Sequence, residues 1–303
     1  MKTGYDVIGL GAAVMDLIAT SPRWPELDEK IHLSDIAYEG GGETATALVT
    51  VDRLGHTASL SAIVGEDYLG HMVRDGLEKE GVDVSRLIVR PGNRTPFAFC
   101  VVEEEAYQRT IFFAGPKGAG LDKHEVDPEW VASSRYLLVD GWHMPAAVQA
   151  SRYAREAGVP VIMDGCRVRI GQENLLPNVD YLIACERYAR EFAGEPEPEK
   201  ALEVLASGPH RFVGITLGHR GFIGRDENGV FRIPAFHVPV RDTTGAGDVF
   251  HGAFAVGLLK GWDVRKTARF ASAVAALKCR ALGGRSAIPG FDETLRFLAQ
   301  YEE

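Results

Sequence analysis

Long apolar runs are absent from this chain of 303 residues, which speaks against a segment that spans a membrane. Blocks of like charge are absent as well, because 33 basic and 42 acidic residues are interspersed at a net charge of −9. We therefore expect neither a nucleic-acid-binding surface nor an attachment to an anionic membrane. Cysteine is scarce: the four residues are scattered without a Cys-x-x-Cys pair, which favours reduced core thiols over a disulfide framework.

Two further absences concern metal sites and targeting. The isolated histidines His71, His143 and His251 lack metal-ligand spacing, so we expect them to be structural or solvated. The first six residues are polar and lead straight into a strand, so no signal peptide is indicated and the cytoplasm is the expected location. The composition that remains, 46% apolar and 25% charged residues, is ordinary for a soluble enzyme with a sizeable core.

Strand and helix patterns alternate over most of the chain. Short buried-strand candidates are separated by helical segments, an order that predicts a mostly parallel sheet with helices on both faces. The strand candidates are residues 136–139, 160–163, 179–183 and 212–216, and the helical segments between and after them include residues 145–158, 186–194 and 199–208.

Three strand-like ranges, residues 30–39, 95–102 and 109–114, lie outside this rhythm, and a polar turn at 103–107 joins the last two. We expect them to form a small sheet that covers the functional site as a lid. The predicted division is an α/β core of residues 1–29, 39–93 and 115–303, and a lid of residues 30–38 and 94–114.

The most informative stretch runs from Arg241 to Phe254. It follows residues 236–240, an alternating β-branched run that predicts a strand, and it continues into a pattern typical of a helix. Glycines at a helix start leave backbone N–H groups free to bind an anion, aided by the helix dipole. Asp248 beside them could deprotonate a hydroxyl while the amides stabilise charge on a transferred phosphoryl group. The alternative is that Asp248 is an ordinary acidic residue in the first turn of a helix.

The run D-T-T-G-A-G-D, residues 242–248, resembles the C-terminal signature of the ribokinase-like (PfkB) carbohydrate kinases, and the resemblance extends over essentially the whole chain. It implies a three-layer α/β/α core with a small β-sheet lid. It also implies that Asp248 is the catalytic base and that the amides of Gly245, Ala246 and Gly247 form the anion hole for the γ-phosphate of ATP. Asp242 and Thr244 match positions that in many members help to bind a monovalent cation, so a requirement for K⁺ stays open.

The same resemblance assigns the sugar side of the site. Asp16 matches an acid that holds two sugar hydroxyls, as a carboxylate can, although a solvated turn residue is the alternative. Gly41 and Gly42 match a motif whose backbone lies against the sugar, or else form a hinge. An Asn of the family is replaced by Thr46, so contacts there must differ. Two basic residues complete the substrate candidates: Arg109 and Lys30, the latter matching an anion-binding lysine of sulfofructose kinases.

On the nucleotide side, residues 215–221 resemble the family's T-L-G-x-x-G segment. Thr216 would contact phosphate together with Thr244, and Gly218 and Gly221 would let the backbone approach the nucleotide. The family's N-x-x-E motif for the metal falls on residues 185–188, where neither end matches. Glu186 is then the remaining acid that could act on Mg²⁺ through water, with an ordinary first-turn acid as the equal alternative.

The resemblance thus implies an ATP-dependent kinase that phosphorylates a primary hydroxyl of a ketose- or pentose-type sugar, nearest the ketohexokinase and sulfofructose kinase branch, with Mg²⁺ as cofactor. An exposed lid sheet needs cover, so a homodimer through the lid is expected. The alternatives are a nucleoside kinase, a sugar-sensing protein without catalysis, and an NAD-dependent oxidoreductase that uses the Gly9–Gly11 segment, which lacks a third glycine.

Overall fold

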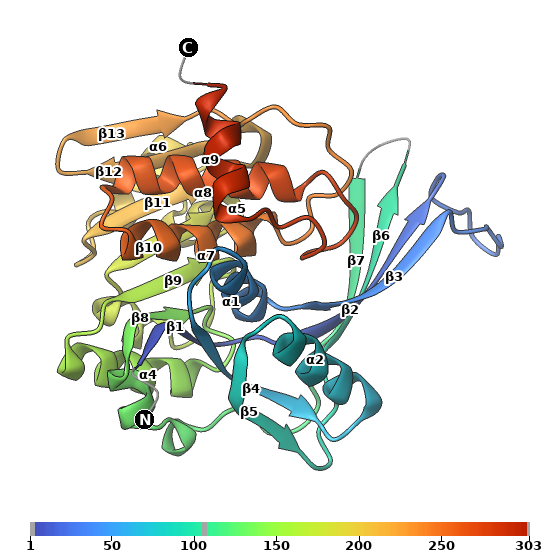
Figure 1. Ribbon diagram of the computed structural model, residues 1–303, viewed down its shortest axis with the longest axis horizontal. Helices are drawn as coiled ribbons and strands as arrows, with labels where there is room; N and C mark the ends of the chain where they lie inside the picture. Colours follow the sequence, from blue (N-terminus) through green and yellow to red (C-terminus); the bar gives the residue numbers. More distant parts are fainter. Residues whose placement is uncertain (1–3, 105–107, 302–303) are drawn as a thin grey trace.

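The computed structural model describes residues 4–104 and 108–301, and within them the chain forms a large and a small β sheet (Figure 1). The large sheet is parallel from β11 to β5, and an antiparallel hairpin of β12 and β13 extends one edge. In spatial order its strands are β13 (Gly229–Ile233), β12 (Phe222–Asp226), β11 (Phe212–Thr216), β10 (Tyr181–Cys185), β9 (Val161–Gly165), β8 (Ser134–Val139), β1 (Tyr5–Leu10), β4 (Ala58–Gly65) and β5 (Asp83–Arg90).

Helices cover both faces of this sheet and bury two separate apolar clusters, which makes three layers. On one face lie α1 (Glu43–Arg53), α2 (Tyr68–Lys79), α7 (Ala246–Leu259), α8 (Val264–Lys278) and α9 (Phe291–Ala299). On the other lie α3 (Pro128–Ala132), α4 (Met144–Ala157), α5 (Glu186–Ala193) and α6 (Pro198–Leu205), with the short 3₁₀ turns η1 (Lys123–Glu125), η2 (Gln172–Asn174), η3 (Leu176–Asn178) and η4 (Gly218–Arg220) in the connections. The predicted alternation of strands and helices is confirmed.

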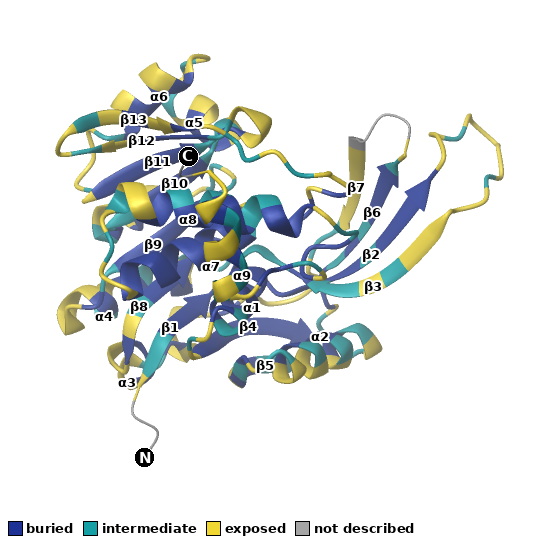
Figure 2. Cartoon of the chain, turned by 45° about the horizontal axis from the view of Figure 1, so that its top comes forward, coloured by how far each residue is buried: buried dark blue, intermediate teal, exposed yellow. Residues whose placement is uncertain are grey.

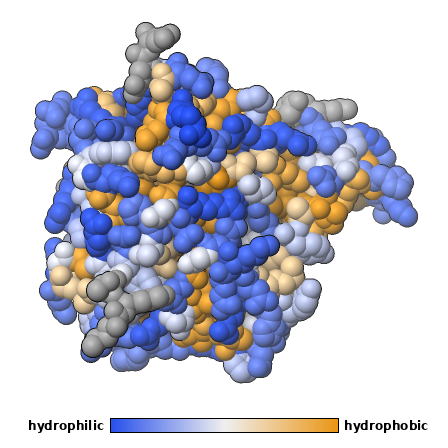
Figure 3. All heavy atoms as spheres, viewed as in Figure 1, coloured by the Kyte–Doolittle hydropathy of each residue, from blue (hydrophilic) through white to orange (hydrophobic). Residues whose placement is uncertain are grey.

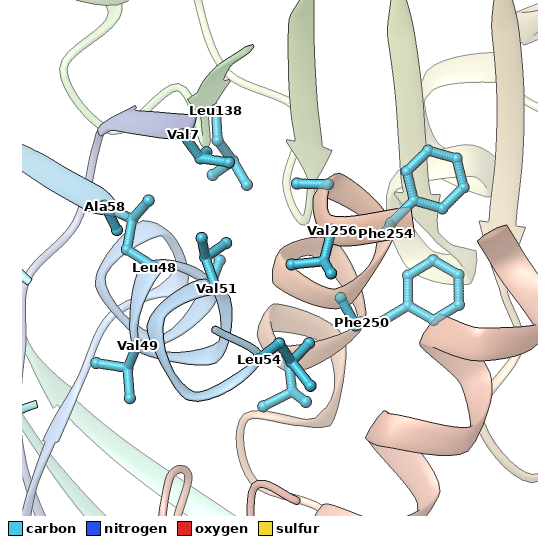
Figure 4. Close-up of a cluster of buried hydrophobic side chains, with 14 of the residues drawn as sticks. Val7, Leu48, Val49, Val51, Leu54, Ala58, Leu138, Phe250, Phe254 and Val256 are labelled. Atoms are coloured by element: carbon cyan, nitrogen blue, oxygen red, sulfur yellow. The ribbon is translucent and has the colours of Figure 1, made fainter. Parts of the chain in front are cut away.

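The central helix is α7, in which every residue from Val249 to Leu259 is buried. A helix that is apolar on all sides has to lie inside the molecule. Helix α1 packs beside α7 in one apolar cluster (Figure 4). On the other side of α7, Phe250 stacks on Phe222 and Phe254 stacks on Phe212. Packing of this kind makes truncation of a buried Phe to Ala costly, by about 3–5 kcal/mol. It therefore holds the first turn of α7 in a defined position at the carboxyl edge of the sheet.

The small sheet projects from the core as an arm (Figures 1 and 2). Its strand order is β3 (Asp35–Gly41), β2 (Val14–Ser21), β6 (Phe97–Glu103) and β7 (Gln108–Ala114). The sequence division assigned residues 14–21 to the core, whereas they pair with both β3 and β6. The chain leaves the large sheet after Leu10 and enters the lid as a second strand. Both strands are apolar, so composition alone does not show that they belong to different sheets.

One further expectation differs from the structure. Residues 236–240 are not a strand, because Pro234 and Pro239 lack the N–H groups that a sheet ladder needs and β13 already ends at Ile233. Of the turn expected at 103–107, residues 105–107 lie outside the described part. Within residues 4–104 and 108–301, no helix has the length and apolar character needed to cross a bilayer.

Candidate active site

The turn before α7 has the geometry of an anion hole. Gly245 is the residue before the helix and adopts φ 73°, where a side chain would be strained and its Cβ would lie 2.9 Å from the backbone of Gly284. No described side chain caps this helix end, although the Ala246 amide donates to the Thr243 carbonyl at 3.2 Å. A Cβ on Gly247 would meet nothing within 4 Å. The helix therefore presents its positive end to open space.

Asp248 stands in the first turn of α7, beside this open space. Desolvation raises the pKa of its carboxyl well above the usual value, and the negative charges of Asp164, Glu43 and Asp16 raise it further, while His251 opposes them. A carboxylate with a raised pKa accepts a proton from a hydroxyl more readily than an exposed one does. Position and proton affinity would both suit a general base.

His251, one turn further along α7, is buried and structural. Its Nδ1 lies 2.7 Å from the Gly247 carbonyl and 3.2 Å from Asp164 Oδ2, and its Nε2 lies 3.1 Å from the Ile183 carbonyl. The ring thereby ties the first turn of α7 to strand β10 and to the end of β9. Of the two roles expected for His251, structural or solvated, these contacts give the structural one.

The predicted cation turn is buried and internally bonded. Asp242 Oδ1 accepts hydrogen bonds from the amide and the hydroxyl of Thr244 at 2.8 and 2.7 Å, and its Oδ2 accepts one from the Gly283 amide at 2.9 Å. The next residue, Thr243, receives a hydrogen bond of 2.6 Å from Arg109 on β7. Arg109 therefore joins the lid to the turn that precedes α7.

On the lid side, Asp16 lies against the predicted glycine motif. A Cβ on Gly41 would lie 2.1 Å from Asp16 Oδ2, so this contact requires glycine, and Gly42 adopts φ 93° before α1. The buried guanidinium of Arg285 donates to the Gly41 carbonyl at 3.0 Å and to Thr46 Oγ1 at 3.2 Å. Thr46, in the place of the family's Asn, thus bonds to a buried arginine from the far end of the chain.

Burial dominates the electrostatics of Asp16. Desolvation raises the pKa of its carboxyl to about 7, partly offset by the positive charge of Arg285 and reinforced by Glu39, Glu43 and Asp242. Because Asp16 also raises the pKa of the catalytic-base candidate, the two carboxyls are close enough to influence each other. The sugar-side and phosphoryl-side candidates therefore belong to one site.

Asp140, which follows β8, was not singled out from the sequence. Its Oδ2 accepts the Ala12 amide at 2.7 Å and the Thr44 hydroxyl at 2.8 Å, and a Cβ on Gly11 would collide with it at 2.2 Å. The Gly11 amide donates to Ser61 at 3.2 Å. The amides and glycines of this segment thus serve internal packing, and β1 continues into a strand rather than a helix, unlike a pyrophosphate-binding turn. The signal in the sequence that could have identified Asp140 is its position at the carboxyl end of the buried strand β8.

The nucleotide candidates lie at the end of β11. The Thr216 hydroxyl is 3.4 Å from the Ala184 carbonyl, and η4 follows with Gly218 at its start. Gly221 has φ 87°, and a Cβ there would lie 2.1 Å from the Ile233 carbonyl of β13. Gly221 is therefore required by the tight turn itself, whereas a Cβ on Gly218 would meet nothing within 4 Å.

Glu186 is engaged on the surface, where it forms an ion pair of 2.5 Å with Arg220. The preceding Cys185 accepts the Tyr188 amide at 3.3 Å and lies 3.2 Å from the carbonyl of Cys166. A hydrogen bond with the Cys166 thiol lowers the pKa of Cys185 to about 6. Among the described residues, no cluster of three His, Cys, Asp or Glu side chains could hold a metal ion.

Lys30 is exposed in the loop beyond the ends of β2 and β3, whereas Asp16 lies near the core end of β2. The structure therefore does not bring Lys30 to the other candidates.

A pocket opens between lid and core, where Phe113 and Trp142 have ring centroids 5.4 Å apart and the Arg169 guanidinium lies 4.2 Å from the Trp142 ring centroid. Its lining includes Ala12, Val14, Pro96, Phe113, Trp142 and His143.

Three charged residues besides Asp140 were missed: Glu43, Lys278 and Arg285. Glu43 accepts a hydrogen bond from Trp142 Nε1 at 3.0 Å, and Lys278 and Arg285 are both buried. For Lys278 the available signal was a single lysine that follows a run of small and apolar residues at the end of α8. Nothing in the local sequence indicated the pairing of Arg285 with a residue 239 positions away.

A parallel sheet with a lid, an uncapped helix start and a neighbouring carboxylate of raised pKa define an α/β kinase of the ribokinase-like class. A family model supports this directly: residues 6–290 match the pfkB family of carbohydrate kinases, and the chain belongs to that family.

Individual relatives agree with this assignment. The chain is 29% identical to the ribokinase of Haemophilus influenzae over 299 residues, covering 95% of this chain and 97% of the relative. It is 26% identical to a nucleoside kinase of Methanothermobacter thermautotrophicus over 310 residues, covering 99% and 98%. The crystal structure of a ribokinase from Thermotoga maritima superposes with a TM-score of 0.85 at 26% identity, covering 97% of this chain and 99% of that one.

Proposed function

We propose that the protein transfers the γ-phosphoryl group of ATP to a primary hydroxyl of a small sugar of the ketose or pentose type. The observation that carries the proposal is the position of Asp248 next to the open helix start at Gly245–Gly247. The sugar oxygen attacks the γ-phosphorus in line, the bond to the bridging oxygen breaks, and ADP leaves. Asp248 takes the proton of the hydroxyl, and the helix amides stabilise the charge on the transferred group.

Binding of the sugar is proposed to rest on Asp16 and the backbone at Gly41 and Gly42. An ionised carboxylate accepts two hydroxyl hydrogen bonds, and glycines let the sugar approach the backbone closely. Arg285 supports this arrangement, because it holds the Gly41 carbonyl and opposes the raised pKa of Asp16. Arg109 is proposed to close the lid over the site through its hydrogen bond to Thr243. A closed lid excludes water and so limits hydrolysis of ATP.

The nucleotide is proposed to lie along Thr216, Gly218 and Thr244, with Mg²⁺ bound mainly by phosphate oxygens and water. Mg²⁺ tolerates such a shell, and the described side chains offer no closed set of ligands. The ion would neutralise phosphate charge. Glu186 could assist through water after leaving Arg220.

A nucleoside kinase of the same fold is the second candidate. Phe113 and Trp142 place two aromatic rings in the pocket between lid and core, where the flat ring of a base could pack. A sugar-sensing protein without catalysis is disfavoured because Gly245, Gly247 and Asp248 are all present. An NAD-dependent oxidoreductase is disfavoured by the internal use of the amides at Gly11 and Ala12.

We further propose a homodimer formed through the lid. Tyr38, Leu17, Phe99 and Phe112 lie in one row across the four strands, on the face opposite to Asp16. Tyr38 and Phe112 are 59% and 52% exposed. Figure 3 shows hydrophobic surface on this arm. An exposed apolar sheet face of this kind is suited to a second copy of the chain.

The test of the activity is ADP release with ATP and Mg²⁺ across a panel of pentoses, ketoses, sugar acids and nucleosides. With the best substrate, Asp248→Asn is expected to lower kcat by about 10²–10⁴-fold with a nearly unchanged KM. Asp75→Asn, an exposed change on α2, is the matched control and should retain full activity. A variant at Asp248 that keeps more than about a tenth of kcat would remove the base assignment. Sugar binding without turnover would favour the sensor.

A further inference from the structure

Lys278 is the last residue of α8, and its side chain has no exposed surface. Lysine is among the residues least often buried, because its ammonium loses strong hydration. The ammonium here has a defined partner: Nζ donates to the main-chain carbonyl of Asp242 at 3.1 Å. A buried ammonium therefore lies against the turn that leads into the anion hole.

The charges nearest this ammonium are mostly negative, with Arg109 as the opposing positive charge. Burial lowers the pKa of Lys278, and the charges of Asp242 and Glu39 counteract this effect. The turn and the end of α8 are also joined through the backbone, since the amides of Arg241 and Asp242 both donate to the Cys279 carbonyl, at 2.8 and 3.3 Å. Both oxygens of the Asp242 carboxylate are already engaged by protein donors.

These contacts do not fit a monovalent metal ion. The resemblance placed such an ion at Asp242 and Thr244, where its ligands would be carbonyl and carboxylate oxygens. The ammonium already supplies one positive charge to this turn, and a second cation beside it would be repelled strongly in a buried environment. Hydrogen bonds from Thr244 and Gly283 occupy the carboxylate that would otherwise face the ion.

We propose that the ammonium of Lys278 replaces the monovalent cation of this turn, so that the protein is independent of K⁺. A cation attached to the chain is present at every salt composition and keeps the 242–244 turn, and hence the start of α7, in place. Lys278 is then a positioning residue that acts through the turn. The inference that activity is independent of K⁺ rests on the proposed function. The inference that K⁺ does not bind to the 242–244 turn does not rest on it.

The experiment compares thermal unfolding without substrates in K⁺, Na⁺ and tetramethylammonium chloride at equal ionic strength. For the wild type we expect equal Tm values in all three salts, and kcat/KM within twofold. A rise in Tm or a fivefold gain in kcat/KM specific to K⁺ would overturn the proposal. This comparison needs no variant, and because unfolding is measured without substrates, its outcome is separate from that of the proposed function.

Variants then test the role of the ammonium. Lys278→Ala leaves space, so we expect a lower Tm in tetramethylammonium that recovers specifically with K⁺ or ammonium ions, together with recovery of kcat. Lys278→Met fills the space without a charge, so it is expected to have reduced kcat without recovery. Lys200→Ala, an exposed change on α6, is the control. A Lys278→Ala protein that folds but responds equally to all three salts would reduce Lys278 to a packing residue and contradict the proposal. If Lys278→Ala does not fold, the wild-type salt comparison and the kcat of Lys278→Met test the proposal in its place.

Discussion

Acidic side chains gather around the start of α7, and this concentration of charge governs the behaviour of single residues. Desolvation raises the pKa of both Asp16 and Asp248, and the charges of Glu43 and other neighbouring acids add to the effect. Arg285 is the buried positive charge that opposes it at Asp16. Carboxyls held in this way destabilise the folded protein when they ionise without a ligand, a cost that is common at functional sites.

Asp16→Asn is expected to stabilise the protein at high pH. The pKa of Asp16 is about 7 in the folded state and about 3.9 in an unfolded chain, so its ionisation disfavours folding by up to about 4 kcal/mol above pH 7. Below about pH 4 the group is protonated in both states and this loss disappears. Thermal unfolding should therefore show a higher Tm for the variant at pH 8 and nearly equal Tm values at pH 4.

Asp75→Asn measured in the same pH series controls for a general effect of charge removal. Equal Tm values of wild type and Asp16→Asn at pH 8 would contradict the raised pKa. The same variant is expected to lose sugar binding in a titration, because its amide has an NH₂ donor and no charge where the carboxylate has a second acceptor oxygen.

The pH dependence of kcat/KM should reflect the same carboxyls. Asp16 must be ionised to accept hydroxyl hydrogen bonds and Asp248 must be ionised to take a proton, so acid pH should inactivate the free enzyme. We expect kcat/KM for the sugar, from initial rates between pH 5 and 9, to be low at pH 5 and to rise as the pH passes the Asp16 pKa of about 7. A profile that stays flat down to pH 5 would mean that neither carboxyl is required in its ionised form.

At the scale of elements, the start of α7 is defined by two glycines with different constraints. Gly245 has a positive φ and lies against the backbone of Gly284, so it is needed for the fold. Gly247 has helical geometry and faces open space, so nothing in the folded chain requires it to be glycine. Under the proposed function that open space holds the γ-phosphate.

A pair of alanine variants separates these roles. Gly245→Ala should lower both stability and activity. Gly247→Ala should keep or raise the Tm, since alanine is favoured over glycine in helices by up to about 1 kcal/mol, but its methyl group should obstruct the anion hole and lower kcat at least about 10²-fold. Full activity of a folded Gly247→Ala protein would show that no phosphoryl group occupies that space.

At the scale of the whole molecule, the lid has two unlike faces. Asp16 and Phe113 lie in rows that face the core, while Tyr38 and Phe112 lie in the alternate row that faces away. Trp24 stacks on Phe112 with ring centroids 6.1 Å apart and extends the outer apolar surface. One face of the sheet therefore carries site candidates, and the other is exposed and apolar, as the proposed dimer requires.

The lid dimer predicts that light scattering after gel filtration gives twice the chain mass at micromolar concentration. A Tyr38→Asp/Phe112→Asp protein should elute as a folded monomer, because charges in a buried apolar interface are costly. Ile170→Asp alters an apolar side chain that is 99% exposed elsewhere and should remain dimeric. A monomeric wild type, or an unchanged mass in the double variant, would exclude this interface.

Local patterns in the chain predicted the fold class, and the resemblance of residues 242–248 to a family signature predicted the kinase class. Alternating strand and helix signals predicted the parallel three-layer core, and residues 242–248 predicted a helix start with an adjacent acid, because turn geometry and helix capping depend on neighbours in sequence. The ribokinase-like fold is confirmed by the solved structure from Thermotoga maritima. Family membership follows from the match over residues 6–290.

The partners of buried charges required the folded chain. Arg285 meets Thr46 across 239 positions, and Lys278 meets Asp242 across 36. The sequence likewise indicated that residues 14–21 are extended, but it did not indicate that they belong to the small sheet. Which charge neutralises which, and which strands pair, depends on contacts between distant segments, and these contacts form only when apolar burial brings the segments together.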